Sequence, residues 1–341
     1  MAAAALTISI LGKVHHPVVE MRLSPLFQST ATEKQSGRTR NASPGAASGL
    51  APIDKPVFEG RALVADPALI ENTPEGPLPR IADDGRRPMT AYAAPAASGK
   101  FRIAIVVSGL GLSARATGLA LKDLPPGVTL AFAPYAGDVQ HWVSQARGLG
   151  HEALLELPME PLDYPDSDPG PNTLRSGVEQ DGNPARLDWA LSRITGYAGV
   201  TSFLGQHFLG DEDALAPILV QLARRGVYFF DNGQAQQSVA ADVAARAGTA
   251  FAKASETLDN VQSATEIDAR LSDLEGEARA HGAAIGAGFL YPVTVERIAL
   301  WAKTLAGRGF VLVPVSAIVT LRNSVEEPVR RTRAAPRPST P

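Results

Sequence analysis

The stretch IAIVVSGLGL, residues 103–112, decides how this chain is expected to fold. Its first five residues are apolar, a glycine-rich turn follows, and the next residues, SARATGLALKDL, have the pattern of a helix. This order is typical of a buried parallel strand that runs into a helix. Active and ligand-binding sites of α/β folds lie just beyond the carboxyl ends of such strands, so Ser108, Gly109 and Gly111 stand at a candidate site. None of the three carries a charge.

The composition is that of an ordinary globular protein. The chain has 341 residues, of which 45% are hydrophobic and 20% charged, and its formal net charge is −3. This balance gives no support for a nucleic-acid partner or for binding to an anionic membrane surface. The absence of cysteine excludes disulfides, thiolate metal ligands and a cysteine nucleophile, but it leaves the redox compartment open.

Both ends of the chain differ in composition from its middle. Residues 1–23 begin with the apolar MAAAALTISILG, which is shorter than the roughly 20 residues of a membrane span and lacks a basic start. This segment is either a frayed terminus or a fragment of an anchor, or it is a targeting element. Residues 24–100, rich in Pro, Gly and Ser, are predicted to be a largely irregular linker, and residues 323–341 a disordered tail.

Residues 101–322 alternate short apolar runs with helical patterns, which predicts a largely parallel sheet with helical crossovers. The predicted strands are 102–107, 128–133, 153–157, 199–201, 227–230, 284–287 and 310–313. The predicted helices are 112–121, 138–149, 184–195, 212–225, 237–247, 264–281 and 293–306. About seven strands in this length suit an irregular barrel or a doubly wound sheet.

Two motifs have both a functional and a structural interpretation. Residues 109–114, GLGLSA, match the loose GxGxxA dinucleotide fingerprint, but no acid ends the next predicted strand to hold a ribose. We therefore interpret them as a tight glycine turn. The loop DYPDSDPGPNTL, with Asp163, Asp166 and Asp168, has oxygen ligands for a hard cation, but Asp and Pro are also the usual turn formers. We interpret this loop as a turn.

Three side chains are candidate catalytic groups. Glu160 follows the third predicted strand, between two prolines that stiffen its position. Asp231 ends the strand YFFD, where it is either a catalytic acid or a cap for the segment that follows. His207 lies in the loop SFLGQHF after a short strand, where it is either a ligand or a structural residue.

Several segments together resemble the divergent polysaccharide deacetylases. They are IAIVVSGLGLS, LPPGVTLAFAPYA, GHEALLELPMEPLDYPDSDPGPNTL, RLDWALSRITGYAGVTSFLG, RGVYFFD, AIGAGFLYPVTVERIALW and RGFVLVPVSA, in this order between about residues 100 and 320. The resemblance implies an irregular (β/α) barrel of about seven parallel strands. It also implies removal of an acetyl group from an N-acetylated sugar by a bound divalent metal with an aspartate as base. A periplasmic or inner-membrane-associated location is implied in the same way.

The chain departs from the family pattern at its metal ligands. Ser108 and Gly109 stand where two adjacent aspartates are usual, Phe203 stands in place of the histidine of an Asn-His pair, and Phe289 in place of the histidine of Gly-His-Pro. Neither a phenyl ring nor glycine can coordinate a metal. We therefore expect no metal and no other cofactor, and a cleft lined by these four residues.

Two hypotheses on function follow from the resemblance and its departures. The first is a degenerate member of the family that acts without a metal or without catalysis and binds a cell-envelope glycan or an envelope protein. The alternative is an active deacetylase or esterase with a site rebuilt around Asp231, Glu160 and His207.

Overall fold

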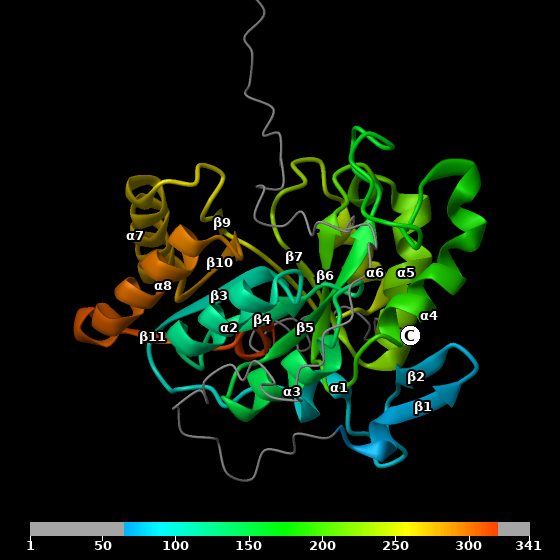
Figure 1. Ribbon diagram of the computed structural model, residues 1–341, viewed down its shortest axis with the longest axis horizontal. Helices are drawn as coiled ribbons and strands as arrows, with labels where there is room; N and C mark the ends of the chain where they lie inside the picture. The colour runs from blue at the N-terminus through cyan, green and yellow to red at the C-terminus, as the bar shows by residue number, and fades with distance from the viewer. Residues whose placement is uncertain (1–64, 320–341) are drawn as a thin grey trace, which may run out of the picture. The chain divides into compact units, whose positions relative to one another are not determined.

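The computed structural model describes residues 65–319, and a curled, parallel β-sheet runs through this part of the chain (Figure 1). Eight of its strands are paired in the order β8-β7-β6-β5-β4-β3-β10-β9, and a ninth, β11, pairs with β3 beside β4. The strands are β3 (Phe101–Leu110), β4 (Thr129–Phe132), β5 (Ala153–Met159), β6 (Gly199–Leu204), β7 (Tyr228–Asp231), β8 (Phe251–Lys253), β9 (Glu256–Thr257), β10 (Ala283–Phe289) and β11 (Phe310–Leu312).

The sheet is buried on both faces, which explains why its strands read as continuous apolar runs. Residues of β3 alternate between two cores: Ile103 and Ile105 belong to a cluster shared with the helices, whereas Ala104 and Val106 belong to a cluster inside the curl. The alternation follows from the period of two along a strand. It allows the face of any residue in the sheet to be assigned from its neighbours.

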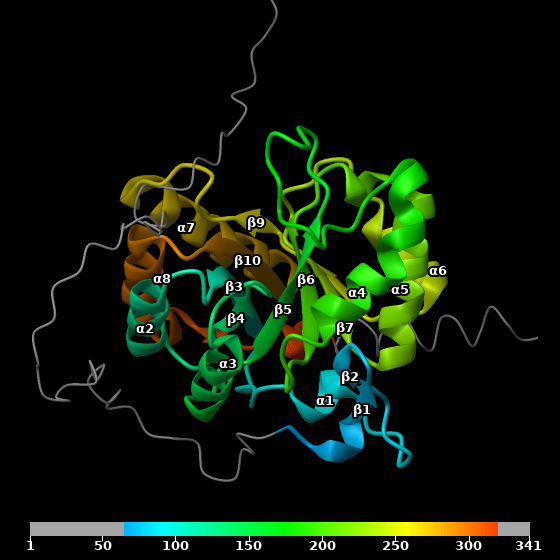
Figure 2. The same cartoon turned by 45° about the vertical axis from the view of Figure 1, so that its right-hand side comes forward.

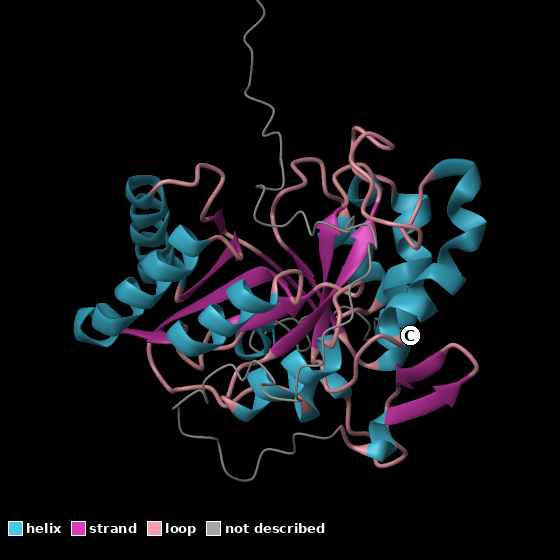
Figure 3. Cartoon of the chain, in the orientation of Figure 1, coloured by secondary structure: helices cyan, strands magenta, loops and turns pink. Residues whose placement is uncertain are grey.

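Helices cover the outer face of the sheet (Figure 3). They are α2 (Ala114–Asp123), α3 (Val139–Gly148), α4 (Asn183–Leu191), α5 (Glu212–Arg225), α6 (Ala240–Ala247), α7 (Ala264–His281) and α8 (Pro292–Leu305). Helix α5 shows how local chemistry sets its limits: the Asp211 side chain accepts a hydrogen bond from the Ala214 amide, and Gly226 ends the helix at φ 71°.

The curl is spanned by a single extended segment, residues 251–257. Its first part, β8, pairs with β7, and its second part, β9, pairs with β10, with two residues between the two strands. The segment therefore bridges the open side of a half-barrel. The predicted irregular barrel of parallel strands is confirmed, with one difference: β11 lies beside the ring, and the segment 251–257, which was not predicted as a strand, takes the seventh position.

Part of the predicted linker belongs to the body of the fold. Within 65–94, β1 (Ile70–Thr73) and β2 (Gly76–Pro79) form an antiparallel hairpin beside α4, and α1 (Pro88–Ala91) follows (Figure 2). Leu69 and Tyr92 are buried in the cluster inside the curl, together with the C-terminal Val315. These apolar side chains are widely spaced among polar and turn-forming residues, which is why no periodicity marks them in the sequence.

The buried carboxylate of Glu152 joins these terminal segments to the barrel. One of its oxygens accepts hydrogen bonds from the Tyr228 hydroxyl at 2.8 Å and the Ser316 amide at 3.1 Å, and the other accepts from the Ala94 amide at 3.3 Å. Burial raises the pKa of Glu152, although these hydrogen bonds oppose the shift. The amino-terminal end of the barrel is thus closed by residues from both ends of the described chain.

The expectations for residues 1–23, for the first part of the linker up to residue 64 and for the tail at 323–341 lie outside the described residues. Among residues 65–319, no helix combines the length and apolar character needed to cross a membrane.

Candidate functional site

The carboxyl ends of the parallel strands lie at one end of the barrel, here called the mouth. The predicted site residues all follow or end strands there: Ser108 and Gly109 in β3, Glu160 after β5, Phe203 in β6, His207 after β6, Asp231 in β7 and Phe289 in β10. The structure divides them into a floor, formed by Ser108, Gly109, Phe289 and the additional Glu156, and a rim cluster centred on Glu160 that includes His207. Asp231 and Phe203 belong to neither group, and Phe203 is half-buried against the cluster shared with the helices.

The floor is built on an irregularity in β3. The pairing of β3 with β4 shifts register between Val107 and Leu110, and Gly109 in this bulge has φ 87°. Such a backbone conformation favours glycine. The Gly109 amide donates a hydrogen bond to Oε1 of Glu156, at 2.5 Å. Glycine at this position therefore permits the bulge, and the Glu156 carboxyl group from β5 satisfies the Gly109 amide.

Glu156 is a fully buried acid in an apolar setting. Burial raises its pKa to about 8, against the opposing effects of the Gly109 amide and the Ser108 hydroxyl. Its second oxygen, Oε2, is buried and has no hydrogen-bond partner among the described residues. At neutral pH this side chain is therefore mostly a neutral carboxylic acid.

Phe289 covers Gly109. A β-carbon added to Gly109 would lie less than 3.0 Å from three atoms of the Phe289 ring. The backbone of Phe289 is held in turn by the buried Asp259, whose Oδ2 accepts hydrogen bonds from the Phe289 amide at 2.7 Å and from the Thr294 hydroxyl at 2.8 Å. The ring thus occupies the space that any longer side chain at position 109 would need.

The residues of the floor do not fit the divalent metal that the resemblance implies. At the four family positions the only polar side chain is the hydroxyl of Ser108, and the rings of Phe203 and Phe289 have no ligand atom. Among residues 65–319, no group of three or more histidine, aspartate or glutamate side chains is arranged to hold a metal ion. Glu156 is a single carboxyl whose one engaged oxygen accepts from a backbone amide.

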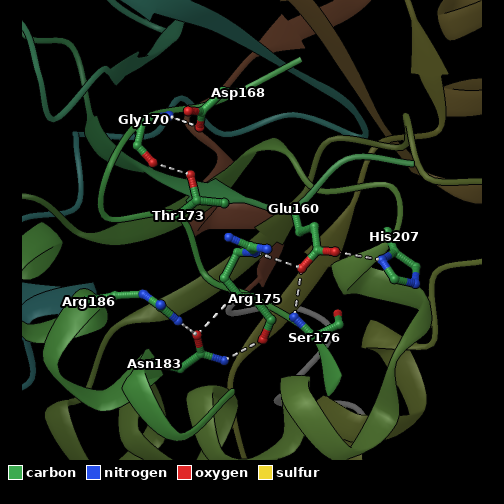
Figure 4. Close-up of polar contacts among 9 residues, drawn as sticks. All are labelled: Glu160, Asp168, Gly170, Thr173, Arg175, Ser176, Asn183, Arg186 and His207. Carbon is green, nitrogen blue, oxygen red and sulfur yellow. Dashed lines mark hydrogen bonds and ion pairs between the residues drawn. The ribbon is translucent and has the colours of Figure 1, made fainter. Parts of the chain in front are cut away.

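The rim cluster consists of Glu160, Arg175, Ser176 and His207 (Figure 4). Oε2 of Glu160 accepts hydrogen bonds from the Ser176 amide at 2.8 Å and from Arg175 Nε at 3.2 Å, and Oε1 lies 3.1 Å from Nδ1 of His207. The Glu160 carbonyl also accepts hydrogen bonds from the amides of His207 and Phe208. Glu160 therefore ties the loop after β5 to the loop after β6.

The electrostatics of the rim cluster favour an ionised Glu160. Burial alone raises the pKa of this carboxyl, but the hydrogen bonds from Ser176, His207 and Arg175 outweigh it and leave the pKa below its usual value. Glu160 thus has no proton to donate at neutral pH, and both of its oxygens are engaged. The His207 side chain is 52% exposed and is oriented by Glu160 through one ring nitrogen.

Asp231 is engaged in the loop that follows β7. Its oxygens accept hydrogen bonds from the Gly233 amide at 2.9 Å and from the Ser238 hydroxyl at 2.7 Å, and Lys253 Nζ lies 3.9 Å away. By alternation, Asp231 shares the face of Phe229, which packs in the cluster shared with the helices. Of the three predicted catalytic groups, the structure therefore joins Glu160 and His207 but places Asp231 on the other face of the sheet.

The two motifs interpreted as turns have the contacts of turns. Ser113 caps α2 by accepting from the Ala116 amide, and the Gly111 amide donates to Thr117 Oγ1. In the acidic loop, Asp163 accepts from the Ser167 hydroxyl and Asp168 from the Gly170 amide, as expected for turn-forming aspartates.

Sequence reasoning missed Glu156, Asp259, Arg175 and Ser176. Glu156 had a recognisable signal, because an acid inside the apolar run ALLELPM must point into the protein on one face of the strand. The other three lie in loops, and no spacing in the sequence indicates that they meet Glu160 or Phe289.

Comparison with known proteins connects this geometry to a family. A family model described as "Divergent polysaccharide deacetylase" matches residues 105–319. The chain is 24% identical to "Uncharacterized protein YibQ" of Escherichia coli (strain K12), over 74% of this chain and 76% of that protein. It is 22% identical to an uncharacterized protein of Haemophilus influenzae, over 57% of this chain and 68% of that one. The crystal structure of an uncharacterized protein from Agrobacterium tumefaciens C58 is similar at a TM-score of 0.70 with 40% identity, covering 71% of this chain and 99% of that chain.

Proposed function

The chain belongs to the divergent polysaccharide deacetylase family, and from this premise we propose that it is a degenerate member that binds a cell-envelope glycan without metal-dependent deacetylation. The packing of Phe289 on Gly109 carries this proposal. A carboxylate side chain at position 109 and the Phe289 ring cannot occupy the same space. The two departures from the family pattern are therefore compatible with each other, and the Phe289 ring excludes the restoration of a carboxylate at position 109.

The packing of the floor also argues against a metal-dependent reaction. A hydrolytic metal site needs several protein ligands and an open position for water. The floor offers one hydroxyl and one carboxyl, and the carboxyl is buried against a backbone amide. What the barrel keeps is its frame and its mouth loops, which suit binding rather than hydrolysis.

Metal analysis and calorimetry test the loss of the metal site. The full chain, purified without chelator, is assayed for bound metal and then titrated with zinc, with a metal-dependent deacetylase as the positive control. We expect no stoichiometric zinc. One zinc per chain, bound at micromolar affinity or tighter, would contradict the proposal.

The glycan and the location are parts of the same proposal and rest on family membership. Binding is tested by titrating N-acetylated and non-acetylated oligosaccharides into the full chain. The periplasmic or inner-membrane-associated location is tested by fractionating cells that produce the tagged full chain, and recovery in the cytosol alone would contradict it. An envelope protein as the partner, in place of a glycan, would show as specific cross-linking in the envelope without oligosaccharide binding.

An active enzyme with a rebuilt site is the second candidate function, favoured by the 3.1 Å contact between Glu160 and His207. A carboxylate that orients an exposed imidazole is a common arrangement for a general base. In this hypothesis His207→Ala abolishes turnover of an acetylated sugar or ester while the fold stays intact, and Asp231→Asn, on the other face of the sheet, leaves the rate unchanged. An active wild-type protein that keeps its rate after His207→Ala would show that the Glu160–His207 pair is not the site.

A further inference from the structure

Exposed apolar side chains gather at one edge of the mouth. Leu112 follows β3 and is 38% exposed, Tyr135 follows β4 and is 39% exposed, and Leu162 follows β5 and is 77% exposed. Because β3, β4 and β5 are consecutive in the sheet, the loops that carry these three side chains are neighbours. We call the surface formed by Leu112, Tyr135 and Leu162 the apolar edge.

Direct contacts join the three loops into one surface. A β-carbon added to Gly111 would lie 2.6 Å from the β-carbon of Ala136, and one added to Gly170 would lie 2.7 Å from the Tyr135 ring. The Tyr135 hydroxyl also accepts a hydrogen bond from the Asn172 amide, at 2.8 Å. Exposed apolar surface that is shared by neighbouring loops indicates an interaction site, whereas scattered single residues do not.

The loop after β5 presents Leu162 in a fixed position. Within this loop Asp163 accepts a hydrogen bond from the Ser167 hydroxyl at 2.7 Å. Asp168 accepts one from the Gly170 amide at 2.8 Å (Figure 4). A side chain on a loop that is already ordered loses little conformational freedom when a partner covers it, so Leu162 is suited to anchor a docked segment.

The charge beside the apolar edge selects the kind of partner. Asp163, Asp166 and Asp168 are exposed, and residues 160–174 contain no lysine or arginine. A second copy of the chain docked here about a twofold axis would bring these carboxylates against their own copies, which is unfavourable. The edge therefore fits a segment that is both apolar and positively charged.

The C-terminal segment of this chain has that composition. Residues 325–341, VEEPVRRTRAAPRPSTP, contain four arginines, four prolines and no acid after Glu327. Proline-rich segments pack on exposed aromatic side chains such as Tyr135, and guanidinium groups stack on aromatic rings or pair with carboxylates. The loop after β5 already takes part in one such stack, since Arg175 lies over the Tyr164 ring at 3.9 Å.

The segment is long enough to reach the apolar edge. Shortly before residue 320 the chain is held at the amino-terminal end of the barrel, where the Val315 and Ser316 amides donate hydrogen bonds to Thr129 and Glu152. Fully extended, residues 320–341 span about 70 Å, whereas the ten residues of β3 cover about 33 Å. The segment can therefore pass along the barrel and still place its arginines at the mouth.

We propose that residues 325–341 dock on the apolar edge of their own chain, with the arginines beside the aspartates of the loop after β5 and the prolines against Tyr135 and Leu162. This contact goes beyond the proposed glycan binding and does not depend on it. It covers the side of the mouth formed by the loops after β3, β4 and β5, so a ligand that enters from this side displaces the segment.

A distance measurement between two spin labels tests the contact, and the absence of cysteine from the chain restricts the labels to chosen sites. The full chain carries Ser339→Cys together with Ser167→Cys in the loop after β5, or together with Ser144→Cys on α3 as the control. We expect a short, narrow distance component for the first pair and a broad distribution for the second. Replacing all four arginines of residues 325–341 by glutamate, or raising the salt to about 0.5 M, should remove the short component.

Single variants locate the docked segment on the molecule. Leu162→Ala removes the apolar anchor and Asp166→Lys reverses one charge of the loop, and we expect each to lower the ratio of docked to free chains roughly fivefold. Leu300→Ala on α8 and Asp123→Lys on α2 make the same changes elsewhere and should alter the ratio less than twofold. All four positions are exposed, and thermal unfolding of each variant checks that the fold is kept.

The outcomes decide the proposal in either direction. Equal, broad distributions for the two labelled pairs would overturn it. A short distance that survives both Leu162→Ala and Asp166→Lys would show that the segment docks elsewhere, which also overturns it. Chains with Ser167→Cys alone are finally mixed with chains with Ser339→Cys alone. A dipolar coupling in this mixture would assign the contact to a second copy and refute docking within one chain.

Discussion

Replacing the buried Glu156 by glutamine changes how the stability of the protein depends on pH. The folded protein holds Glu156 with a pKa of about 8, whereas the ordinary value is 4.5. Between these values the folded state binds a proton that the unfolded chain releases. The free energy of unfolding therefore falls as the pH rises from 4.5 toward 8, and it stops falling once the pH exceeds the folded pKa. Glutamine keeps an acceptor for the Gly109 amide and does not titrate.

The size of the effect follows from the two pKa values. Each pH unit inside the window lowers the free energy of unfolding by about 1.4 kcal/mol. From pH 5.5 to pH 7.5, the free energy of unfolding of the wild-type protein therefore falls by about 2 to 3 kcal/mol more than that of the variant. The absolute stability of Glu156→Gln also contains a cost of about 1–3 kcal/mol for an amide group without partners, so the change with pH is the quantity to compare.

Urea unfolding of wild type and Glu156→Gln at pH 5.5, 6.5 and 7.5 measures this change. All other titrating groups are common to both proteins and cancel in the difference. Glu296→Gln on α8, which removes a solvent-exposed carboxylate, is the matched control, and we expect its difference from wild type to stay constant within about 0.5 kcal/mol. A constant difference between Glu156→Gln and wild type would refute a raised pKa at Glu156 and with it the apolar character of the floor.

Three further predictions concern the packing of the mouth and the closure of the barrel, each measured by urea unfolding at pH 7 and, for Glu160→Gln, also at pH 4. Gly109→Ala is expected to lower the free energy of unfolding by about 3 kcal/mol, because of its positive φ and its contact with Phe289. The double variant with Phe289→Ala is expected to be about 1–2 kcal/mol more stable than the sum of the two single changes, and strict additivity would contradict the contact. Glu160→Gln is expected to cost about 2 kcal/mol at pH 7 and less at pH 4, because a carboxylate with a lowered pKa stabilises the fold above its unfolded pKa and loses this effect on acidification; equal costs at both pH values would argue against the lowered pKa. Glu152→Ala is expected to cost about 4 kcal/mol, against about 1 kcal/mol for Tyr228→Phe, which removes one of its hydrogen bonds; similar costs would mean that Glu152 does not hold the terminal segments.

Much of the fold was predictable from local pattern. The strand 102–107 and the helix after it appear as β3 and α2, because an apolar run buried on both faces and a capped amphipathic segment are marked residue by residue. The short strands β8 and β9 were missed, since two or three residues carry no period. The hairpin of β1 and β2 was missed because its anchors are separated by prolines, glycines and charges.

The candidate site was predictable in position but not in arrangement. The ends of parallel strands meet at one end of a barrel, so Ser108 was placed at the mouth by its position at the end of a predicted strand, and Phe203 and Phe289 were placed there by the family resemblance. The direction of a side chain depends on register and on bulges, which the sequence does not display. For this reason Asp231 was a candidate by position, whereas Glu156, with one oxygen on the Gly109 amide, was not considered.

The sequence by itself determined the class of fold, the family resemblance and the replacement of the metal-ligand residues, because each of these depends on residue type and order along the chain. The tertiary structure alone decided what those replacements do. It shows the Phe289 ring on Gly109, the buried Glu156 carboxyl behind the bulge and the two loops joined by Glu160. Glu156 and Gly109 are 47 positions apart in the chain, and so are Glu160 and His207. Gly109 and Phe289 lie on two different strands, β3 and β10. Such contacts follow from strand register and loop packing, and no local pattern encodes them.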